Sequence, residues 1–298
     1  MTSLDHADIV RQTADLVAEH YVFPELGDKI ATQLRAALAE GRYDAAGDAE
    51  TLGRLVTEDL QSANDDRHLR LAFHETPVPT GKDAAAEQLM VTRAADSCAG
   101  VPRFELLDGA VALVELAPLL FPLRFSADSL TSVLTLAAQA RALIVDLRAN
   151  RGGDPYTVQF ICSYLFDEPT HINTQYWREA DAEEQAWTLP FVPGRRFGAE
   201  KPVYVLTSGT TFSGAEELTY DLQQLGRAVV VGERTGGGAH PRNGWTVHPH
   251  LEATIPVGRA INPTSGTNWE GTGVQPDIEV PAAEALERAH REALARLG

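Results

Sequence analysis

A serine followed by glycine at a predicted strand-to-helix turn is the side chain of this sequence best placed for nucleophilic chemistry. Ser213 lies in the segment 207–217, after an apolar, β-branched run at 203–206 and before leucines that recur at helical spacing over 218–225. This pattern predicts strand, sharp turn and helix, with Ser213 at or beside the helix N-terminus. Free backbone N–H groups and the positive dipole end favour an anion there, and an acyl-transfer oxyanion is one. The alternative interpretation is a serine N-cap without a catalytic role.

A second predicted strand-to-helix turn carries two adjacent glycines. A continuous apolar run at 142–147 is typical of a buried parallel strand, and Asp154 can cap the helix that follows. Between them, Gly152 and Gly153 permit positive φ and a close approach of a ligand to backbone N–H groups, although a tight turn without a ligand is equally compatible. Strands and helices alternate over 142–232, so we expect both glycine turns at the carboxyl edge of one parallel sheet.

The N-terminal third reads as three amphipathic helices, around 9–17, 30–38 and 52–60, the last with a possible N-cap at Asp48. An alternating segment, 68–73, predicts a strand that begins with His68 on the side opposite its apolar residues. Taken alone, such a histidine is interpreted as a surface residue at a strand start.

Further along the chain, segment 74–100 reads as a loop and Ser126 as the cap of a helix. The mixed segment 166–200 is interpreted as a hairpin or cover loop, and a helix over 281–297 closes the chain.

Composition limits the class of protein and its partners. The 298 residues are 44% hydrophobic and carry a formal charge of −17, so the chain can bury a sizeable core and would be repelled by nucleic acid. No basic and apolar leader and no run of 18 apolar residues occurs, so we expect a cytoplasmic protein without membrane insertion. Cys98 and Cys162 belong to no metal motif, and G-x-G-x-x-G is absent. We therefore expect no disulfide, no metal and no cofactor.

Four motifs together resemble those of a known family. They comprise residues 65–69 (DDRHL), 146–153 (DLRANRGG), 211–216 (TFSGAE) with 231–239 (VGERTGGGA) behind it, and 269–277 (WEGTGVQPD). In this order they resemble the tail-specific (C-terminal processing) serine peptidase superfamily, in the branch that contains tricorn protease and the interphotoreceptor retinoid-binding protein.

The resemblance covers nearly the whole chain and carries expectations about fold. It implies an α/β protein with a crotonase-like (ClpP/crotonase) αββ core at 67–298 and an N-terminal three-helix domain at 1–66. No segment resembles the PDZ insert of many processing proteases.

The resemblance also assigns roles to individual residues. It makes Ser213 the nucleophile, His68 its general base and Glu270 the acid that completes the charge network, and it gives the oxyanion hole to the N–H groups of Gly153 and Gly214. A serine hydroxyl attacks only with a neutral imidazole in reach, and that imidazole needs an orienting acceptor, so the chemistry fits these roles. An imidazole base predicts an acidic limb of activity near pH ~6.5.

The resemblance leaves other machinery and other functions to be weighed. A Ser/Lys dyad would place its lysine where this chain has Gly238, and no lysine follows Lys201, which favours the histidine base. We therefore expect a serine peptidase of the C-terminal processing type that acts on a peptide or small acyl substrate. The alternatives are a carrier for a retinoid- or fatty-acyl-like ligand in the same cleft, or a small ester or amide hydrolase. The oligomeric state stays open.

Overall fold

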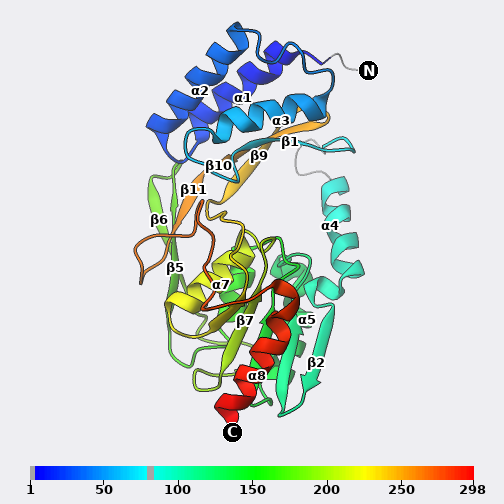
Figure 1. Ribbon diagram of the computed structural model, residues 1–298, viewed down its shortest axis with the longest axis vertical. Coiled ribbons are helices and arrows are strands. Elements are labelled where there is room, and N and C mark those ends of the chain that lie inside the picture. The colour runs from blue at the N-terminus through cyan, green and yellow to red at the C-terminus, as the bar shows by residue number, and fades with distance from the viewer. Residues whose placement is uncertain (1–3, 79–83) are drawn as a thin grey trace. The chain divides into compact units, whose positions relative to one another are not determined.

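The computed structural model describes residues 4–78 and 84–298, and the chain divides into two compact units. Unit 1 comprises Met1–Glu87, Gln175–Glu184 and His240–Ala260, and unit 2 comprises Gln88–Thr174, Gln185–Ala239 and Ile261–Gly298. The mixed α/β class, with a helical N-terminal region and a sheet core, is confirmed (Figure 1). The boundary between residues 66 and 67 that the sequence suggests stays a prediction.

The helical part of unit 1 follows the apolar stripes of its sequence. Its helices are α1 (His6–His20), α2 (Pro24–Ala39) and α3 (Ala49–Gln61). The predicted cap of α3 is confirmed, because the Asp48 side chain accepts a hydrogen bond of 2.8 Å from the Thr51 N–H. The three stripes therefore face one core.

That core is closed by an antiparallel sheet of three strands, in the order β1-β10-β9, with β1 (Arg70–Phe73), β9 (Arg242–His248) and β10 (Leu251–Pro256). Its inward residues Leu71, Leu251 and Ala253 are buried against the helices. The strand predicted from residue 68 begins at Arg70, so His68 belongs to the turn before it.

Unit 2 is built on a six-stranded sheet in the order β12-β8-β7-β4-β3-β2. Its strands are β2 (Arg103–Leu107), β3 (Val111–Glu115), β4 (Ala142–Asp146), β7 (Val203–Thr207), β8 (Val229–Gly232) and β12 (Ile278–Glu279). All neighbours pair in parallel except β2 with β3. The predicted parallel arrangement of β4, β7 and β8 is confirmed, and their carboxyl ends lie level, since Asp146 pairs with Leu206 and Thr207 with Gly232.

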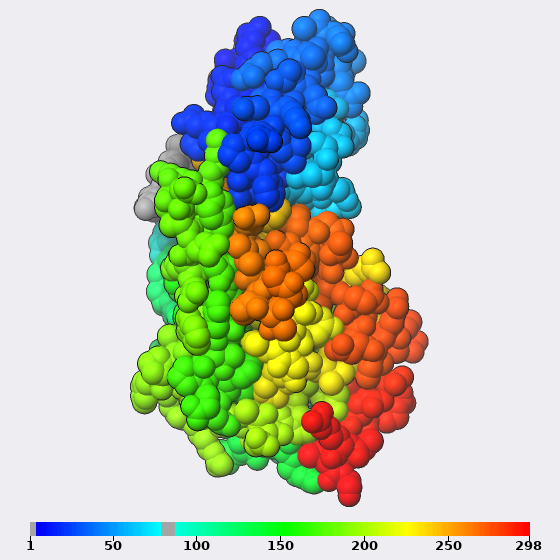
Figure 2. Space-filling model, turned by 90° about the vertical axis from the view of Figure 1, so that its left-hand side faces the viewer, coloured from blue at the N-terminus to red at the C-terminus, as the bar shows by residue number. Residues whose placement is uncertain are grey.

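Helices cover both faces of this sheet. Along β4, Leu143 and Val145 pack in one apolar cluster with α5 (Leu123–Ala137), α6 (Pro155–Cys162) and α7 (Gly214–Gln224). The alternate residues Ala142 and Ile144 pack against α8 (Ala285–Leu297), whose outer side lies on the surface, red in Figure 2. Buried side chains on both faces explain the continuous apolar run at 142–147.

A third sheet, in the order β11-β5-β6, contains β5 (His171–Trp177), β6 (Ala182–Trp187) and β11 (Gly258–Ile261). Strands β5 and β6 lie in segment 166–200, which was expected to form a hairpin or cover loop. The remaining elements are α4 (Ala84–Asp96) and the short 3₁₀ helices η1 (Cys98–Gly100) and η2 (Ala282–Glu284). Over residues 4–78 and 84–298, no helix is both long and apolar enough to span a bilayer.

Two predictions of local structure were wrong. Segment 74–100 contains α4 and η1, because Pro77, Pro79 and Gly81 precede a stretch rich in alanine, which favours helix. Ser126 does not cap α5, which begins three residues earlier at Leu123; its hydroxyl donates a 2.8 Å hydrogen bond to the Phe121 carbonyl instead.

Candidate active site

The two glycine turns meet at the carboxyl edge of the sheet in unit 2. Gly152 has φ +107° and Gly153 has φ +143°, which is a conformation that side chains disfavour. A Cβ on Gly152 would lie 2.7 Å from the Ser213 Cβ, and a Cβ on Gly214 would lie 2.8 Å from the Gly153 carbonyl oxygen. The turn after β4 therefore packs backbone to backbone against the turn after β7, and only glycines allow that approach.

This packing brings two backbone N–H groups close together. An ideal Cβ on Gly214 lies 3.0 Å from the Gly153 nitrogen. A Cβ lies about 2.5 Å from the nitrogen of its own residue, so the two amide nitrogens are at most about 5.5 Å apart. Two donors to one oxygen need a separation below about 6 Å. Neither N–H group donates to an acceptor within the described part of the chain.

Further hydrogen bonds lock the two turns to each other. The Asn150 side chain is fully buried, accepts a 2.8 Å bond from the Gly152 N–H and donates one of 2.9 Å to the Leu116 carbonyl. From the other turn, the Thr211 hydroxyl donates to the Leu147 carbonyl at 2.9 Å. The site in unit 2 is thus held by backbone and buried amide groups, which rigidify it.

Ser213 occupies a strained position at the start of α7. Its φ of 53° and ψ of −125° are unusual for a residue with a side chain, and such a conformation costs roughly 1–3 kcal/mol. Strained backbone of this kind gathers at functional sites, where the surrounding structure enforces it. The Glu216 carboxylate contributes here, because its Oε2 accepts a 2.8 Å hydrogen bond from the Ser213 N–H.

Glu216 connects this turn to the glycine-rich segment after β8. The carboxylate is fully buried and also accepts hydrogen bonds from the Thr235 hydroxyl and from the N–H groups of Gly237, at 2.7 Å, and Gly238, at 2.9 Å. Burial raises the pKa of Glu216 above its usual value, and the four donors act in the opposite direction.

Glu270 is fastened to the same glycine-rich segment. Its Oε2 accepts a 2.5 Å hydrogen bond from the Ala239 N–H, while the buried neighbour Trp269 donates from its indole N–H to the Gly238 carbonyl at 2.9 Å. The Gly271 N–H donates to the Gly237 carbonyl at 3.0 Å. Glu270 is half-buried, and its loop is hydrogen-bonded to three successive residues of the glycine-rich segment, 237–239.

Ser208, five residues before Ser213, has a different environment. It follows the end of β7, and its hydroxyl donates a 2.7 Å hydrogen bond to the Arg148 carbonyl. It therefore lies outside the first turn of α7, where the helix dipole would favour a developing anion.

His68 belongs to unit 1 and is buried, with 6% of its surface exposed. The expectation of a surface histidine was wrong, because alternation in a short segment does not show what covers a side chain from other parts of the sequence. Its backbone N–H donates to the Asp66 Oδ1 at 3.1 Å, and its carbonyl accepts a 2.6 Å hydrogen bond from the Thr254 hydroxyl on β10. Both backbone groups of His68 are therefore fixed.

Burial lowers the pKa of His68 to about 4. The negative charge of Asp66 opposes this shift, whereas Arg242, Arg70 and His240 reinforce it. The imidazole is consequently neutral at pH 7, as a general base must be, and its pKa lies below the value near 6.5 expected of an ordinary histidine.

Sequence reasoning missed three residues of these surroundings as functional candidates. Glu216 had a visible signal, since Ser-x-x-Glu at a helix start is the pattern of a capping box. Asp66 belongs to the 65–69 motif around His68, but the resemblance assigned no role to it. His240, whose Nδ1 lies 2.8 Å from the Asp66 Oδ2, carries no signal in the sequence.

Unit 2 contains four of the five residues predicted for catalysis: Ser213, Gly153, Gly214 and Glu270.

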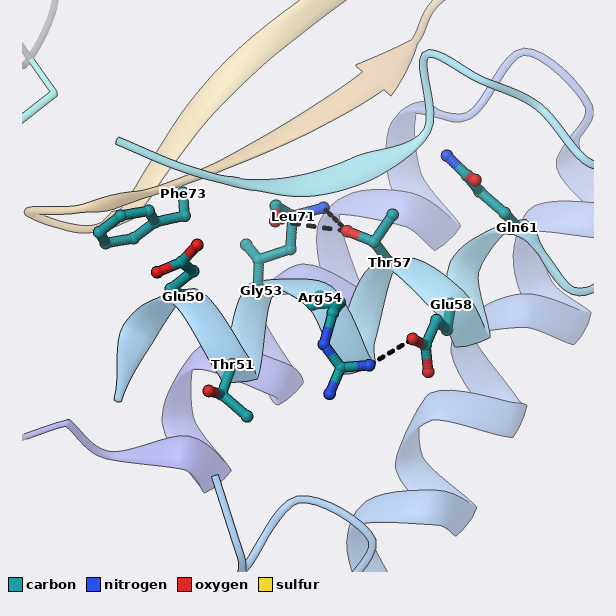
Figure 3. Close-up of a pocket in the computed structure, with 9 residues that line it drawn as sticks. All are labelled: Glu50, Thr51, Gly53, Arg54, Thr57, Glu58, Gln61, Leu71 and Phe73. Carbon is teal, nitrogen blue, oxygen red and sulfur yellow. Dashed lines mark hydrogen bonds and ion pairs between the residues drawn. The ribbon is translucent and has the colours of Figure 1, made fainter. Parts of the chain in front are cut away.

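A separate pocket of about 530 Å³ lies in unit 1 beside α3 and β1 (Figure 3). A Cβ on Gly53 would lie 2.8 Å from the Leu71 carbonyl oxygen, so this glycine permits the close packing of α3 against β1. The Thr57 side chain contacts the Leu71 backbone, and Arg54 pairs with Glu58 among the lining residues. None of the five residues proposed from the sequence for catalysis lines this pocket.

Comparison with known families assigns the chain. Residues 124–280 match the model of peptidase family S41, and residues 4–98 match the N-terminal domain of S41 peptidases in eukaryotic IRBP. The chain belongs to peptidase family S41, a family of serine peptidases. The resemblance inferred from the four motifs is thereby confirmed.

Solved structures share the fold at low sequence identity. A lipoprotein from Streptococcus agalactiae is 15% identical over 99% of this chain and 98% of its own, with a TM-score of 0.61. The photosystem II D1 C-terminal processing protease is 15% identical over 96% and 97%, with a TM-score of 0.53. Mature CPAF complexed with lactacystin is 11% identical over 99% and 98%, with a TM-score of 0.65. At these identities the likeness shows the fold alone.

Proposed function

We propose that this S41 peptidase cleaves peptides through an acyl-enzyme on Ser213, with His68 as general base and Glu270 as the acid of the charge network. The N–H groups of Gly153 and Gly214 form the oxyanion hole, on a core of crotonase-like architecture. One observation carries the proposal: two backbone N–H groups without acceptors in the described chain lie within about 5.5 Å of each other beside a strained serine.

The proposed reaction follows from these groups. His68 takes the proton of the Ser213 hydroxyl as the oxygen attacks the scissile carbonyl carbon. The carbonyl oxygen becomes an oxyanion, which the Gly153 and Gly214 N–H groups stabilise without reorganisation. The protonated imidazole then gives its proton to the leaving amine, and water hydrolyses the acyl-enzyme by the same steps in reverse.

The position of Lys201 supports a histidine base over a lysine. Its ammonium group donates hydrogen bonds to the carbonyls of Ala138 and Ala140, which precede β4. That is the amino end of the parallel strands, opposite the edge where the glycine turns meet. The lysine therefore lies at the end of the strands opposite Ser213, where it cannot activate that hydroxyl.

The peptide class also follows from comparison. A structural neighbour is described as a C-terminal processing protease, and we propose the same class of substrate here: a polypeptide cleaved near a free C-terminus. A carrier for a retinoid- or fatty-acyl-like ligand would need neither the strained serine nor the paired N–H groups. A small ester or amide hydrolase would use the same residues on another substrate.

Matched peptides test the proposal. One peptide series carries a free C-terminal carboxylate and its twin a C-terminal amide, and cleavage is followed by mass spectrometry with wild type and Ser213→Ala. We expect cleavage of the free-carboxylate series by wild type alone. Cleavage of simple esters but of neither peptide series would favour the small-molecule hydrolase. Tight binding of a fluorescent fatty acid without any turnover would favour the carrier.

A further inference from the structure

Unit 1 contains a buried pair of a carboxylate and an imidazole next to the proposed base. Asp66 is fully buried, and 5% of the surface of His240 is exposed. The Asp66 Oδ2 accepts hydrogen bonds from the His240 Nδ1, at 2.8 Å, and from the Tyr21 hydroxyl, at 2.9 Å. A buried carboxylate with two such partners has a fixed orientation, because any rotation would leave buried polar groups unsatisfied.

The second oxygen of this carboxylate acts on His68. Asp66 Oδ1 accepts the His68 backbone N–H at 3.1 Å, which closes a tight turn between the two residues. The negative charge of Asp66 also raises the pKa of His68 and opposes the effect of burial. One carboxylate therefore holds the backbone of the proposed base and tunes its basicity.

His240 in turn keeps Asp66 ionised. Burial alone would raise the pKa of Asp66, but the hydrogen bond and charge of His240, together with the Tyr21 hydroxyl, bring this pKa below its usual value. The imidazole of His240 is itself held edge-on against the Phe23 ring, with the ring centroids 5.5 Å apart. Loss of His240 would remove both an orienting donor and a source of Asp66 ionisation.

We propose that Asp66 and His240 form a positioning pair for His68, which fixes the backbone of the general base and maintains the negative charge beside its imidazole. The inference rests on the proposed role of His68. Among the described residues of unit 1, Asp66 raises the pKa of this imidazole, whereas Arg242, Arg70 and His240 lower it.

Four variants separate positioning from mere stability. Asp66→Asn keeps the shape and removes the charge. His240→Ala removes the donor, whereas His240→Asn retains an amide donor near the Nδ1 position. His74→Gln is the matched control, because His74 pairs with the Glu252 carboxylate at 3.0 Å in the same unit, whereas Asp66 bonds to Tyr21, His240 and the His68 backbone.

The first readout is the reaction rate. We expect kcat/KM for peptide cleavage to fall roughly 10- to 100-fold in Asp66→Asn and His240→Ala, as loss of a charge-assisted hydrogen bond predicts. His240→Asn should recover most of this loss, to within about 3-fold of wild type, and His74→Gln should match wild type. Equal rates for His240→Ala and His240→Asn in folded proteins would contradict the positioning role.

The second readout does not depend on turnover. Two-bond ¹H–¹⁵N correlation spectra report the tautomer and titration of each imidazole, with the His68 signals assigned by their loss in His68→Gln. In Asp66→Asn we expect the His68 pKa to fall below about 4, because the charge that raises it is gone. Unchanged His68 signals in Asp66→Asn and His240→Ala would overturn the inference.

This second readout also separates the two proposals. A wild type that neither cleaves peptides nor forms an adduct on Ser213 would refute the proposed function, while the imidazole titration would still decide whether the pair positions His68. If His240→Ala does not fold, the isosteric Asp66→Asn and the conservative His240→Asn give the same decision.

Discussion

The surroundings of His68 in unit 1 and of Ser213 in unit 2 each contain a buried carboxylate that holds the backbone N–H of the candidate residue. Asp66 has an imidazole partner, which brings its pKa below the usual value, and it acts on His68 by charge as well as by hydrogen bonding. Glu216 has four uncharged donors, and burial raises its pKa. The carboxylate in unit 1 thus sets basicity, whereas the one in unit 2 sets geometry.

The largest expected effect tests whether the geometry of the two glycine turns in unit 2 governs activity. Gly153→Ala should lower kcat/KM by at least roughly 10²- to 10³-fold, the effect of losing one oxyanion donor. The new Cβ would lie 2.1 Å from the Leu120 carbonyl oxygen, so the turn must shift. The measurement is kcat/KM for peptide cleavage, with folding monitored by circular dichroism.

Gly226→Ala is the matched control for this change. Gly226 also has positive φ, +64°, but a Cβ there would meet no atom within 4 Å. We expect it to reduce stability by about 1 kcal/mol, the cost of a left-handed conformation for a residue with a Cβ, and to leave the rate unchanged. Similar rate losses in both variants would show that backbone strain, and not the meeting of the two turns, governs activity.

The second prediction separates the two carboxylates. Glu216→Gln should lower kcat/KM on the order of 10²-fold, because the amide NH₂ replaces one carboxylate oxygen and faces a donor at either position. At Oε1 it would face the Gly237 N–H, and at Oε2 it would face the Gly238 and Ser213 N–H groups and release the Ser213 turn. The acidic limb of the pH profile should stay where it is in wild type. A displaced limb in this variant would mean that Glu216, like Asp66, acts through charge.

The third prediction concerns the pH dependence set by unit 1. The active form of His68 is the neutral imidazole, so a pKa lowered to about 4 keeps activity down to about pH 4 and removes it below. At pH 5 an imidazole of pKa ~6.5 would be neutral in only about 3% of molecules, whereas one of pKa ~4 would be neutral in about 90%. The measurement is kcat/KM for the free enzyme between pH 3.5 and 8.

Two other outcomes would change the account of the base. A limb near pH ~6.5 would mean that the imidazole is solvated in the active protein, and a limb of pKa well above 8 would indicate a lysine.

The smallest expected effect concerns a third buried carboxylate, on the same helix as Glu216. Asp221 is fully buried, its Oδ2 has no hydrogen-bond partner within the described chain, and burial together with the charge of Glu217 raises its pKa well above the usual value. A raised carboxyl pKa makes the native protein hold a proton that the unfolded chain releases, so stability falls as pH rises above ~4.

Asp221→Asn should therefore raise Tm by a few degrees at pH 8, about 2–4 °C for each kcal/mol gained, with a difference that shrinks towards pH 4. Thermal unfolding at both pH values measures this, and activity should not change. A lower Tm at pH 8 would show that the ionised Asp221 is stabilised by its surroundings.

The same comparison shows what the sequence could predict. In unit 2 the signals are local: the apolar run of β4, the cap at Asp154 and the leucines of α7 lie within short windows, and both turns sit between adjacent elements. Parallel strands then bring the turns to one edge whatever the loops between them do. The positions of Gly153, Gly214 and Ser213 follow from that rule.

Unit 1 could not be predicted in this way, because its site depends on contacts between distant segments. The His68 carbonyl accepts a hydrogen bond from Thr254 on β10, and Asp66 meets His240 across 174 positions of sequence. Alternation in a short segment predicts which face a side chain occupies, but it does not say what covers that face. The pKa of His68 therefore also lay beyond sequence reasoning.

The most direct test of the central claim is the site of covalent labelling by a fluorophosphonate, read by intact mass and peptide mapping. We expect one adduct per chain on Ser213, which is retained in Ser208→Ala, absent in Ser213→Ala and formed much more slowly in His68→Ala, with all variants folded. An adduct on Ser208, or full labelling of Ser213→Ala, would contradict the central claim.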